Sequence, residues 1–564
     1  MKILLVTEKY NPDNNQRDGG ARLVDTLKNA FDGCLQIMQF GLQVDSSAEW
    51  NFNYPISSTN RFKRRIANAE FIAWQVKAVE EHFTHVIFIH ISMQFGLVDL
   101  PLRKEICIWT FPMFLTPSYQ RSGEIIPAEY TAIERIALVN SLNILTPSHL
   151  EKKQLIEFYS IPEKQIHVVP RGIDISLLAP KVRSLKDSPS FCSIGSIKPQ
   201  KNTLGLVDLF AKLIIKFPGS TLRIIGPNQD NEYYTMVLAK IQLLRLTNSI
   251  ELMGHVIPAD LAHAIKNCHI HISTSLCETF GRSIFETLAS GLPNIARLKD
   301  NASAEYLSHL PYTKFVKDDN EALSAIEEVL SNLPKLSSMA IEIGRLYDDA
   351  MLSRLLAAKI CSRKVIVISD FDGTLFYKND VEKTTRCMRV FQQFQTKVIC
   401  SARSINDLLE NIKFYNLEVD WIIGYSGAMV TDGKGKLLWF NPLNINDIDR
   451  LKDLVPQFKV IKFEEEIIQI ALPIESLPNI TGLNIETYQN TAFISNWEAS
   501  KFRAIHRLLR HINWTGSVKA FGDGLYDKEF LTYFDGELII PSDQVNIKMT
   551  HLKKNQEILS SEII

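Results

Sequence analysis

Short apolar runs alternate with longer amphipathic segments along almost the whole chain. Runs such as Ile3–Val6 and Val365–Ile368 contain only Ile, Leu and Val, which is typical of strands buried on both faces of a sheet. Residues 21–31, "ARLVDTLKNAF", instead carry apolar positions at helical spacing. Strands that alternate with amphipathic helices favour parallel sheets with crossover helices, so the pattern predicts an α/β fold.

The same pattern divides the chain into three parts. A chain of 564 residues is too long for a single hydrophobic core. A polar linker at 177–190 and the end of a helical stretch, Ser337–Lys359, separate units of α/β pattern. We therefore predict two domains at 1–180 and 181–360. A third domain is expected at 364–564, with a small α/β cap inserted near 428–497.

Composition excludes several classes of protein. The formal net charge of -1 argues against general nucleic-acid binding. Eight scattered cysteines without a C-x-x-C pair indicate reduced thiols rather than a disulfide framework. The apolar run at the N-terminus is too short for a signal peptide, and no uncharged stretch approaches the ~20 residues of a membrane span. We expect a soluble, cytoplasmic protein.

The segment Ser273–Ala296, "STSLCETFGRSIFETLASGLPNIA", carries the first candidate site. It predicts a strand, a loop with Glu278, and a helix that starts near Phe280 and Gly281 and contains Glu286. Free backbone N–H groups at a helix start hold phosphate without a metal ion. Upstream, "GSIKPQKN" supplies two lysines, Lys198 and Lys201, for a diphosphate.

These motifs resemble those of retaining glycosyltransferases of GT-B fold, the group 1 family that includes sucrose-phosphate synthase. The resemblance covers roughly 1–360 and is strongest over 190–296, where Glu278 and Glu286 form the E-x7-E pattern. It implies two Rossmann-like domains, with Glu278 on the donor sugar, Glu286 on the ribose and Lys201 on the leaving diphosphate. It also implies a nucleotide-sugar donor and no metal in this part.

The resemblance bears on three other positions, two of which depart from the family, and the basic run Arg61–Arg65 is interpreted from its charge. Ser196 stands where the family usually has Arg, and Lys198 is our candidate for the missing charge. Many members carry a His after the strand "ICIW", and His90 is the nearest polar candidate here. By resemblance, the loop ending at Gly19 and Gly20 lies over the cleft. The basic run Arg61–Arg65 is either a solvated face or a site for a phosphorylated acceptor or an anionic membrane.

The third domain carries carboxylates at strand ends. "SDFDGTLF" places Asp370 and Asp372 directly after an apolar run. Further along, the chain offers a hydroxyl, a lysine at a helix start and two more acids on a glycine-rich turn: Ser401, Lys501, Asp523 and Asp527. Together they predict a magnesium site of hard oxygen ligands next to a phosphate pocket, with Asp370, Asp372, Asp523 and Asp527 as the ligands.

The ordered set resembles that of haloacid dehalogenase-superfamily phosphatases, in the branch of sucrose-phosphate and trehalose-phosphate phosphatases. The resemblance spans about 364–545, and "GDGLYD" matches the G-D-G-x-x-D of that branch. It implies that Asp370 attacks phosphorus and that Asp372 acts as acid and base. Ser401 and Lys501 are implied on the phosphate.

The two resemblances together suggest consecutive steps: glycosyl transfer from a nucleotide-sugar to a phosphorylated acceptor, then Mg²⁺-dependent removal of the phosphate. Three alternatives stay open. The transferase could serve a cell-surface glycan or a secondary metabolite, with the phosphatase acting on a separate intermediate. One module could be a non-catalytic sensor, or the first part a phosphorylase. Donor, acceptor and oligomeric state are not set by the sequence, and peripheral membrane contact is compatible with it.

Overall fold

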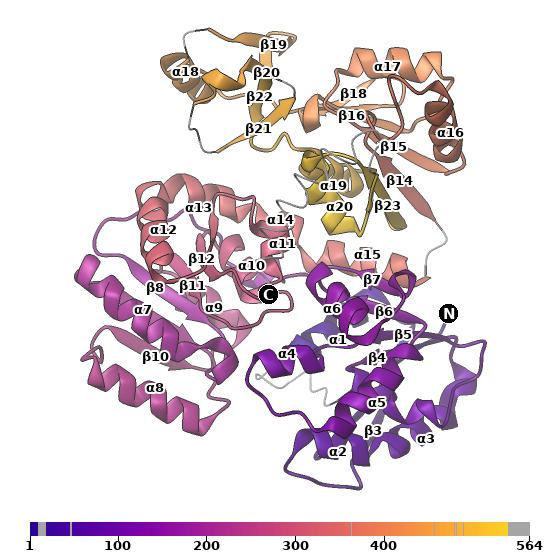
Figure 1. Ribbon diagram of the computed structural model, residues 1–564, viewed down its shortest axis with the longest axis vertical. Helices are drawn as coiled ribbons and strands as arrows, with labels where there is room; N and C mark the ends of the chain where they lie inside the picture. The colour runs from indigo at the N-terminus through magenta and orange to yellow at the C-terminus, as the bar shows by residue number, and fades with distance from the viewer. Residues whose placement is uncertain are drawn as a thin grey trace. The chain divides into compact units, whose positions relative to one another are not determined.

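The computed structural model describes residues 1–8, 19–44, 48–361, 364–455, 457–478, 480, 482–488 and 490–539. The chain divides into two compact units, Met1–Ile360 and a second that begins at Cys361. Figure 1 shows the helices and strands of each unit, coloured along the chain. None of the described helices is both long and apolar enough to cross a lipid bilayer.

The first unit contains two fully parallel sheets. One has seven strands in the order β3-β2-β1-β4-β5-β6-β7, and the other has six in the order β10-β9-β8-β11-β12-β13. The strands of the first sheet are β1 (Ile3–Glu8), β2 (Leu35–Gly41), β3 (Trp50–Asn53), β4 (His85–Ile89), β5 (Cys107–Phe111), β6 (Asn143–Thr146) and β7 (Ile166–Val168). Those of the second are β8 (Ser190–Ile194), β9 (Thr221–Ile225), β10 (Ile250–Gly254), β11 (Ile270–Ser273), β12 (Asn294–Arg297) and β13 (Thr313–Val316).

Helices cross between these parallel strands, as the alternating pattern predicts. Around the first sheet they are α1 (Gly19–Ala30), α2 (Arg61–Ala67), α3 (Ala69–Val79), α4 (Thr116–Arg121), α5 (Ala128–Val139) and α6 (His149–Tyr159). Around the second they are α7 (Thr203–Lys216), α8 (Asn231–Leu243), α9 (Pro258–Ala264), α10 (Arg282–Ala289), α11 (Ser303–Leu307), α12 (Asp319–Ser331), α13 (Leu333–Ile341) and α14 (Ile343–Leu346). The last helix, α15 (Asp349–Cys361), returns to the first half, where Thr26 Oγ1 donates to Asp349 Oδ1 at 2.9 Å.

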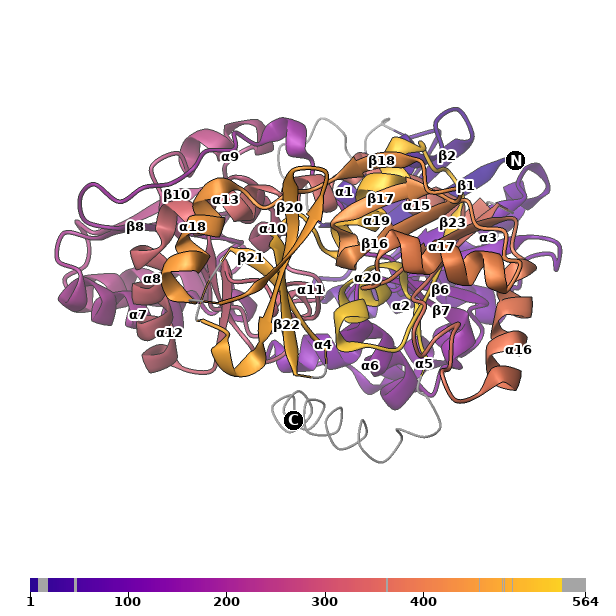
Figure 2. The same ribbon diagram turned by 90° about the horizontal axis from the view of Figure 1, so that it is seen from above.

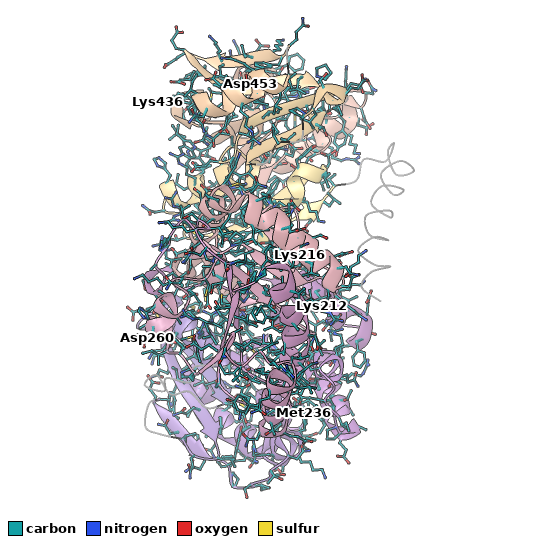
Figure 3. All side chains as sticks on the ribbon, turned by 90° about the vertical axis from the view of Figure 1, so that its left-hand side faces the viewer. Lys212, Lys216, Met236, Asp260, Lys436 and Asp453 are labelled. Carbon is teal, nitrogen blue, oxygen red and sulfur yellow. The ribbon has the colours of Figure 1, made fainter. Side chains whose placement is uncertain are left out.

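Helix α7 shows how sequence spacing selects the buried face. Its apolar residues Leu206, Phe210 and Leu213 recur at helical spacing and are buried. Lys212 and Lys216 lie on the surface (Figure 3) and pair with acids of α12. One helix therefore packs on the sheet and presents charge to water.

The second unit is built on a mixed sheet of seven strands in the order β18-β17-β16-β15-β14-β23-β24. Its strands are β14 (Val365–Ser369), β15 (Thr396–Cys400), β16 (Trp421–Gly424), β17 (Met429–Asp432), β18 (Leu437–Phe440), β23 (Ser517–Gly522) and β24 (Glu537–Leu538). Its helices are α16 (Val381–Gln392), α17 (Ile405–Phe414), α19 (Lys501–His511) and α20 (Lys528–Phe534). The central strands β14, β15 and β23 are parallel, so their carboxyl ends meet at one edge.

A separate antiparallel sheet forms the cap of this unit. Its strands, in the order β19-β20-β22-β21, are β19 (Lys459–Phe463), β20 (Glu466–Pro473), β21 (Leu483–Tyr488) and β22 (Thr491–Asn496). Figure 2 labels β20, β21 and β22. Helix α18 (Ile445–Leu454) packs on its apolar face. The cap expected at 428–497 therefore begins too early, because the hairpin β17–β18 pairs antiparallel with β16 and extends the main sheet.

Candidate active sites

The first candidate site lies where β11 leads into α10. Glu278 is in the connecting loop and Glu286 is inside the helix, as the sequence predicts. Gly281 caps the helix with φ of 82°, a left-handed conformation that glycine adopts without strain. The backbone can turn sharply here and present the first N–H groups of α10 to the cavity.

Each of the two acids is held by a cation from another segment. Lys201 Nζ lies 2.5 Å from Glu278 Oε1. Arg22 NH1, from α1, lies 2.6 Å from Glu286 Oε1. Arg22 was not among the sequence candidates, although it stands only two residues after Gly20 in the chain.

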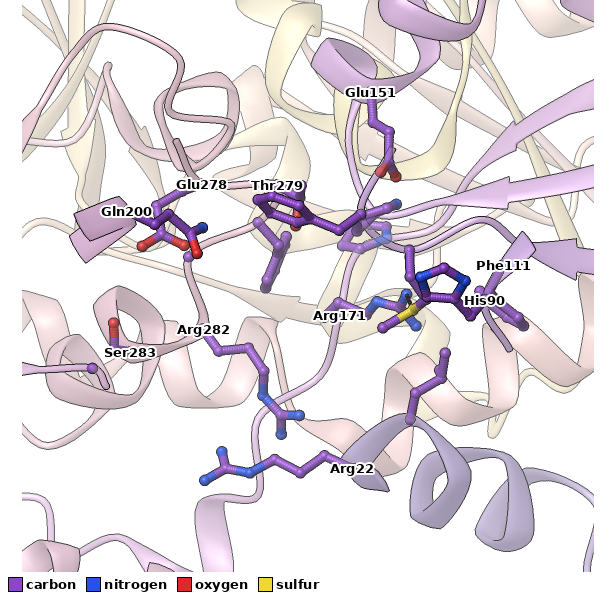
Figure 4. Close-up of a pocket in the computed structure, with 18 of the residues that line it drawn as sticks. Arg22, His90, Phe111, Glu151, Arg171, Gln200, Glu278, Thr279, Arg282 and Ser283 are labelled. Atoms are coloured by element: carbon purple, nitrogen blue, oxygen red, sulfur yellow. Dashed lines mark hydrogen bonds between the residues drawn. The ribbon is translucent and has the colours of Figure 1, made fainter. Parts of the chain in front are cut away.

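Both acids line a cavity of about 540 Å³, whose residues come from both sheets of the first unit. Seven cationic side chains and four carboxylates line it: Arg22, Arg61, Arg65, Arg171, Lys198, Lys201 and Arg282 against Glu124, Glu151, Glu278 and Glu286. Figure 4 shows Arg22 and Arg282 pointing toward one another across the open space. The formal excess of three positive charges suits a ligand that carries phosphate groups.

His90 lies at the end of β4 and faces the same cavity. Its φ of 77° is unusual for a residue other than glycine, a kind of strain found most often at functional sites. Ser92 N donates to Nδ1 at 3.2 Å, so the ring proton lies on Nε2, which is 3.4 Å from Tyr119 Oη. Burial, with Arg65 and Arg61 nearby, holds the pKa of His90 well below its usual range. The imidazole is neutral at pH 7.

The basic run Arg61–Arg65 is divided between cavity and surface. Arg61 and Arg65 line the cavity, while Lys63 is exposed. Arg61 pairs with Glu124 and stacks on the ring of Tyr119 at 4.9 Å. The run is therefore not one continuous solvated face.

Of the other predicted site residues in the first unit, some line the cavity and some do not. Helix α1 begins at Gly19, and the polar loop before it, 11–18, is outside the described residues. Lys198 and Phe280 line the cavity, with the ring of Phe280 stacked on Phe285 at 4.5 Å. Burial, and Lys201 nearby, lower the pKa of Lys198. Ser196 does not line the cavity.

In the second unit, Asp370 directly follows β14 and is almost fully buried. Lys501 Nζ lies between two carboxylates, 3.0 Å from Asp370 Oδ1 and 2.7 Å from Asp527 Oδ1. Burial raises the pKa of Asp370 well above its usual range, while Lys501 opposes this rise and Asp527 adds to it. The single ammonium therefore does not neutralise this group of acids.

Three of the four predicted metal ligands come together. Asp370, Asp523 and Asp527 each offer an oxygen, and these oxygens all lie within 4.8 Å of one another. A Cβ on Gly373, whose φ is 74°, would lie 2.1 Å from Asp523 Oδ2, so only glycine lets the two loops approach this closely. A set of hard oxygen donors with excess negative charge fits Mg²⁺.

The carboxylate of Asp372 is not part of this group, so a metal contact at Asp372 stays a prediction. Arg403 holds its carboxylate with two hydrogen bonds of 2.6 Å, from Nε and from NH2. The side chain of Asp372 remains 47% exposed. Arg403 was missed, although "CSAR" ends on it, because no local pattern indicates that a cation faces Asp372.

Ser401 and the cap complete the surroundings of Asp370. Ser401 directly follows β15, is buried, and its Oγ accepts a hydrogen bond from Arg403 N at 3.2 Å. From cap strand β21, Glu486 accepts a hydrogen bond from Ser426. Burial raises the pKa of Glu486, and Lys501 opposes the rise. No local motif indicated Glu486, because the fold alone brings the cap strand to this site.

Comparisons with known proteins find a family match in each of the two units. Residues 175–346 match the family model for glycosyl transferases group 1, and residues 367–468 match that for haloacid dehalogenase-like hydrolase. The chain carries a group 1 glycosyltransferase domain of GT-B fold, followed by a haloacid dehalogenase-like hydrolase domain. Both are enzyme families, and the predicted fold class is confirmed.

Particular relatives are distant. The chain is 24% identical over 387 residues to the alpha-monoglucosyldiacylglycerol synthase of Streptococcus pneumoniae, covering 62% of this chain and 82% of the relative. It is 25% identical to the mannosylfructose-phosphate synthase of Agrobacterium fabrum, over 27% of this chain and 36% of that protein.

Two solved structures share the GT-B fold. The sucrose-phosphate synthase of Thermosynechococcus elongatus superposes with a TM-score of 0.54 at 16% identity, over 62% of this chain and 96% of that one. The structure of Anabaena Alr3699/HepE in complex with UDP superposes with a TM-score of 0.51 at 15% identity. The match covers 64% of this chain and 99% of that one.

Proposed function

We propose that the chain is a bifunctional enzyme. Its first unit transfers a glycosyl group, with retention, from a nucleotide-sugar to a phosphorylated acceptor. Its second unit then removes the phosphate with the help of Mg²⁺. The observation that carries the proposal is one chain holding both a cavity with an excess of cations and a complete group of Asp370, Lys501, Asp523 and Asp527.

In the transferase, the residues of the second sheet are assigned to the donor. Lys198, Lys201 and the N-terminus of α10 at Gly281 hold the diphosphate, because fixed cations and free N–H groups stabilise the negative charge that develops on the leaving group. Glu278 binds the donor sugar and Glu286 the ribose. Lys201 and Arg22 already orient these two carboxylates, so the site is partly preorganised.

In the phosphatase, Asp370 is the nucleophile. One of its oxygens forms a bond to phosphorus while the bond from phosphorus to the alcohol oxygen breaks, and Asp372 gives that oxygen a proton. Asp372 then takes a proton from water, whose oxygen attacks phosphorus and releases phosphate and free Asp370. In this role Asp372 must turn away from Arg403.

Charge on the transferring group is neutralised in two ways. Lys501, at the start of α19, and Ser401, directly after β15, contact the phosphoryl oxygens. Asp370, Asp523 and Asp527 would hold Mg²⁺, which supplies further positive charge for the phosphoryl group when bound.

A test of the transferase assignment measures release of nucleoside diphosphate from a set of nucleotide-sugars with paired acceptors that differ only in a phosphate. The proposal expects release to depend on the phosphorylated member of a pair. The mannosylfructose-phosphate synthase among the relatives, named for a phosphorylated product, supports this choice. Equal release with both members of every pair would contradict it.

The relative named for a glucosyldiacylglycerol supports a second candidate, transfer to a cell-surface lipid or glycan with the phosphatase acting on a separate intermediate. The same assay distinguishes the two when vesicles that contain diacylglycerol are offered as acceptor. We favour a cytoplasmic sugar-phosphate acceptor because cationic side chains are in excess along the cavity.

A further inference from the structure

Most cations of the transferase cavity already have a carboxylate partner. The ion pairs are Lys201 with Glu278, Arg22 and Arg282 with Glu286, Arg65 with Glu8, and Arg61 with Glu124. Within the described part of the chain, Arg171 and Lys198 form no ion pair of this kind. Lys198 lies beside Lys201 in the loop already assigned to the donor diphosphate. Arg171 has no part in the contacts proposed for the donor.

Arg171 belongs to "PRGID", which follows the last strand of the first sheet, β7. Its guanidinium lies 5.1 Å from the ring centre of Phe111, and NH2 lies 3.7 Å from Met113 Sδ. A ring face and a thioether satisfy few of the five N–H donors of a guanidinium. The charge is thus only partly compensated by the protein.

Two acids act on Arg171, and Glu151 has the larger effect, ahead of Asp349. Glu151 does not balance the charge of Arg171. Glu151, from the first turn of α6, is 2% exposed, and neither carboxylate oxygen has a hydrogen-bond partner among the described residues. Burial raises the pKa of Glu151 to about 8, although Arg171 opposes the rise. At pH 7 this carboxyl is mostly protonated, so the cavity keeps the positive charge of Arg171. Burial lowers the pKa of Arg171 to about 10, which leaves the guanidinium charged.

An uncompensated cation inside a cavity is costly unless a ligand brings an anion. The location of Arg171 in the cavity indicates which of the two substrates supplies the anion. Phe111, His90 and Arg171 all lie at the carboxyl edge of the first sheet, and Figure 4 shows Arg171 pointing toward the other two. Lys198, Lys201 and α10 belong to the second sheet.

We propose that Arg171 is the receptor for the phosphate group of the acceptor. Its planar fork places two N–H donors on two phosphate oxygens, a geometry that a lysine cannot reproduce. This assignment rests on the proposed function, since it names the residue that reads the phosphate of the phosphorylated acceptor. Lys198 is the corresponding unpaired cation on the donor side.

The first test substitutes Arg171→Lys in the full-length enzyme and measures steady-state kinetics of nucleoside diphosphate release. We expect KM for the phosphorylated acceptor to rise about tenfold to a hundredfold, the range for losing a bidentate contact to a charged group. KM for the nucleotide-sugar and turnover of the unphosphorylated acceptor should not change. The control is Arg135→Lys, an exposed arginine outside the cavity. A rise in KM for the donor alone, or no change in either, would overturn the proposal.

A second test measures binding, so that it remains decisive even if no acceptor is turned over. Calorimetry with full-length wild type and with Arg171→Ala uses inorganic phosphate and, separately, UDP as probes, in EDTA. The phosphatase unit is identical in both proteins and contributes equally, so the difference reports the cavity. Loss of one class of phosphate site with UDP binding retained supports the proposal. Unchanged phosphate binding, or parallel loss of UDP binding, contradicts it.

Retained UDP binding and an unchanged circular dichroism spectrum show that the first unit, which carries Arg171, is folded in the variants. If the transferase assay fails with every acceptor pair while the binding difference is present, the proposed function fails and the phosphate site at Arg171 stands. If phosphorylated acceptors are used but Arg171→Lys has no effect, only the assignment of Arg171 fails.

Discussion

Replacing Lys501 with methionine removes the ammonium that lies between two buried carboxylates. The side chains of Lys501, Asp370 and Asp527 are 6%, 8% and 0% exposed, so solvent does not screen the loss. Breaking a buried ion pair by removing one partner costs about 3–5 kcal/mol, because the remaining charge is left without compensation. We expect Lys501→Met to lower the free energy of unfolding of the second unit by that amount at pH 7.

The same variant has a predictable pH dependence. The pKa of Asp370 is already raised in the folded protein, and removing Lys501 raises it further. A carboxyl with a raised folded pKa binds protons more tightly when folded than when unfolded. The destabilisation should therefore shrink as pH falls toward the unfolded value of about 4, grow as pH rises toward the folded pKa, and level off above it.

The assay is calorimetric unfolding of the full chain between pH 5 and 8, with and without Mg²⁺. A cation bound by the three carboxylates should restore part of the loss, about 2.7 kcal/mol at a hundredfold excess over its dissociation constant. Lys519→Met, an exposed lysine of β23, is the control. A loss no larger than that of the control, or one that grows at low pH, would refute the reasoning.

The remaining predictions concern the two activities. Glu278→Gln should reduce nucleoside diphosphate release by at least ~100-fold, as for other residues that stabilise a transition state, with phosphatase activity unchanged in a phosphate-release assay. EDTA should abolish phosphate release and leave transfer intact, because α10 and the lysines take the place of a metal; transfer that stops in EDTA would contradict this. Gly373→Ala should weaken the binding of Mg²⁺, measured by titrating phosphatase activity with the ion, by about tenfold or more. The added methyl group would meet Asp523 Oδ2, and the backbone at this position would be strained. Unchanged Mg²⁺ dependence would show that the two loops do not share the ion.

Local sequence pattern accounts for much of the fold. Residues Ile3–Val6 form a central parallel strand buried on both faces, as four consecutive aliphatic residues predict. The cap boundary was wrong for a physical reason. "MVTDGKGKLLWF" reads as a hairpin, and nothing in its alternation tells whether that hairpin starts a new sheet or extends an old one.

For the sites, too, local features could be predicted from the sequence and contacts between distant segments could not. Strand ends and helix starts could be located from sequence, so the positions of Glu278, Asp370 and Lys501 on their loops and helices were predictable. The ion pairs that the acids of the two sites form with distant arginines could not be predicted. Arg22 and Arg403 reach Glu286 and Asp372 from segments whose position depends on packing of the whole domain.

Asp370→Asn tests the central claim, that transfer and dephosphorylation are consecutive, most directly. The substitution keeps the shape of the side chain and removes the nucleophile. The measurement is mass spectrometry of products from full-length wild type and variant, each given a nucleotide-sugar, a phosphorylated acceptor and Mg²⁺. Consecutive steps predict that the variant still consumes the nucleotide-sugar and accumulates a glycoside that retains its phosphate. Release of the same dephosphorylated glycoside by the variant and the wild type would contradict the claim.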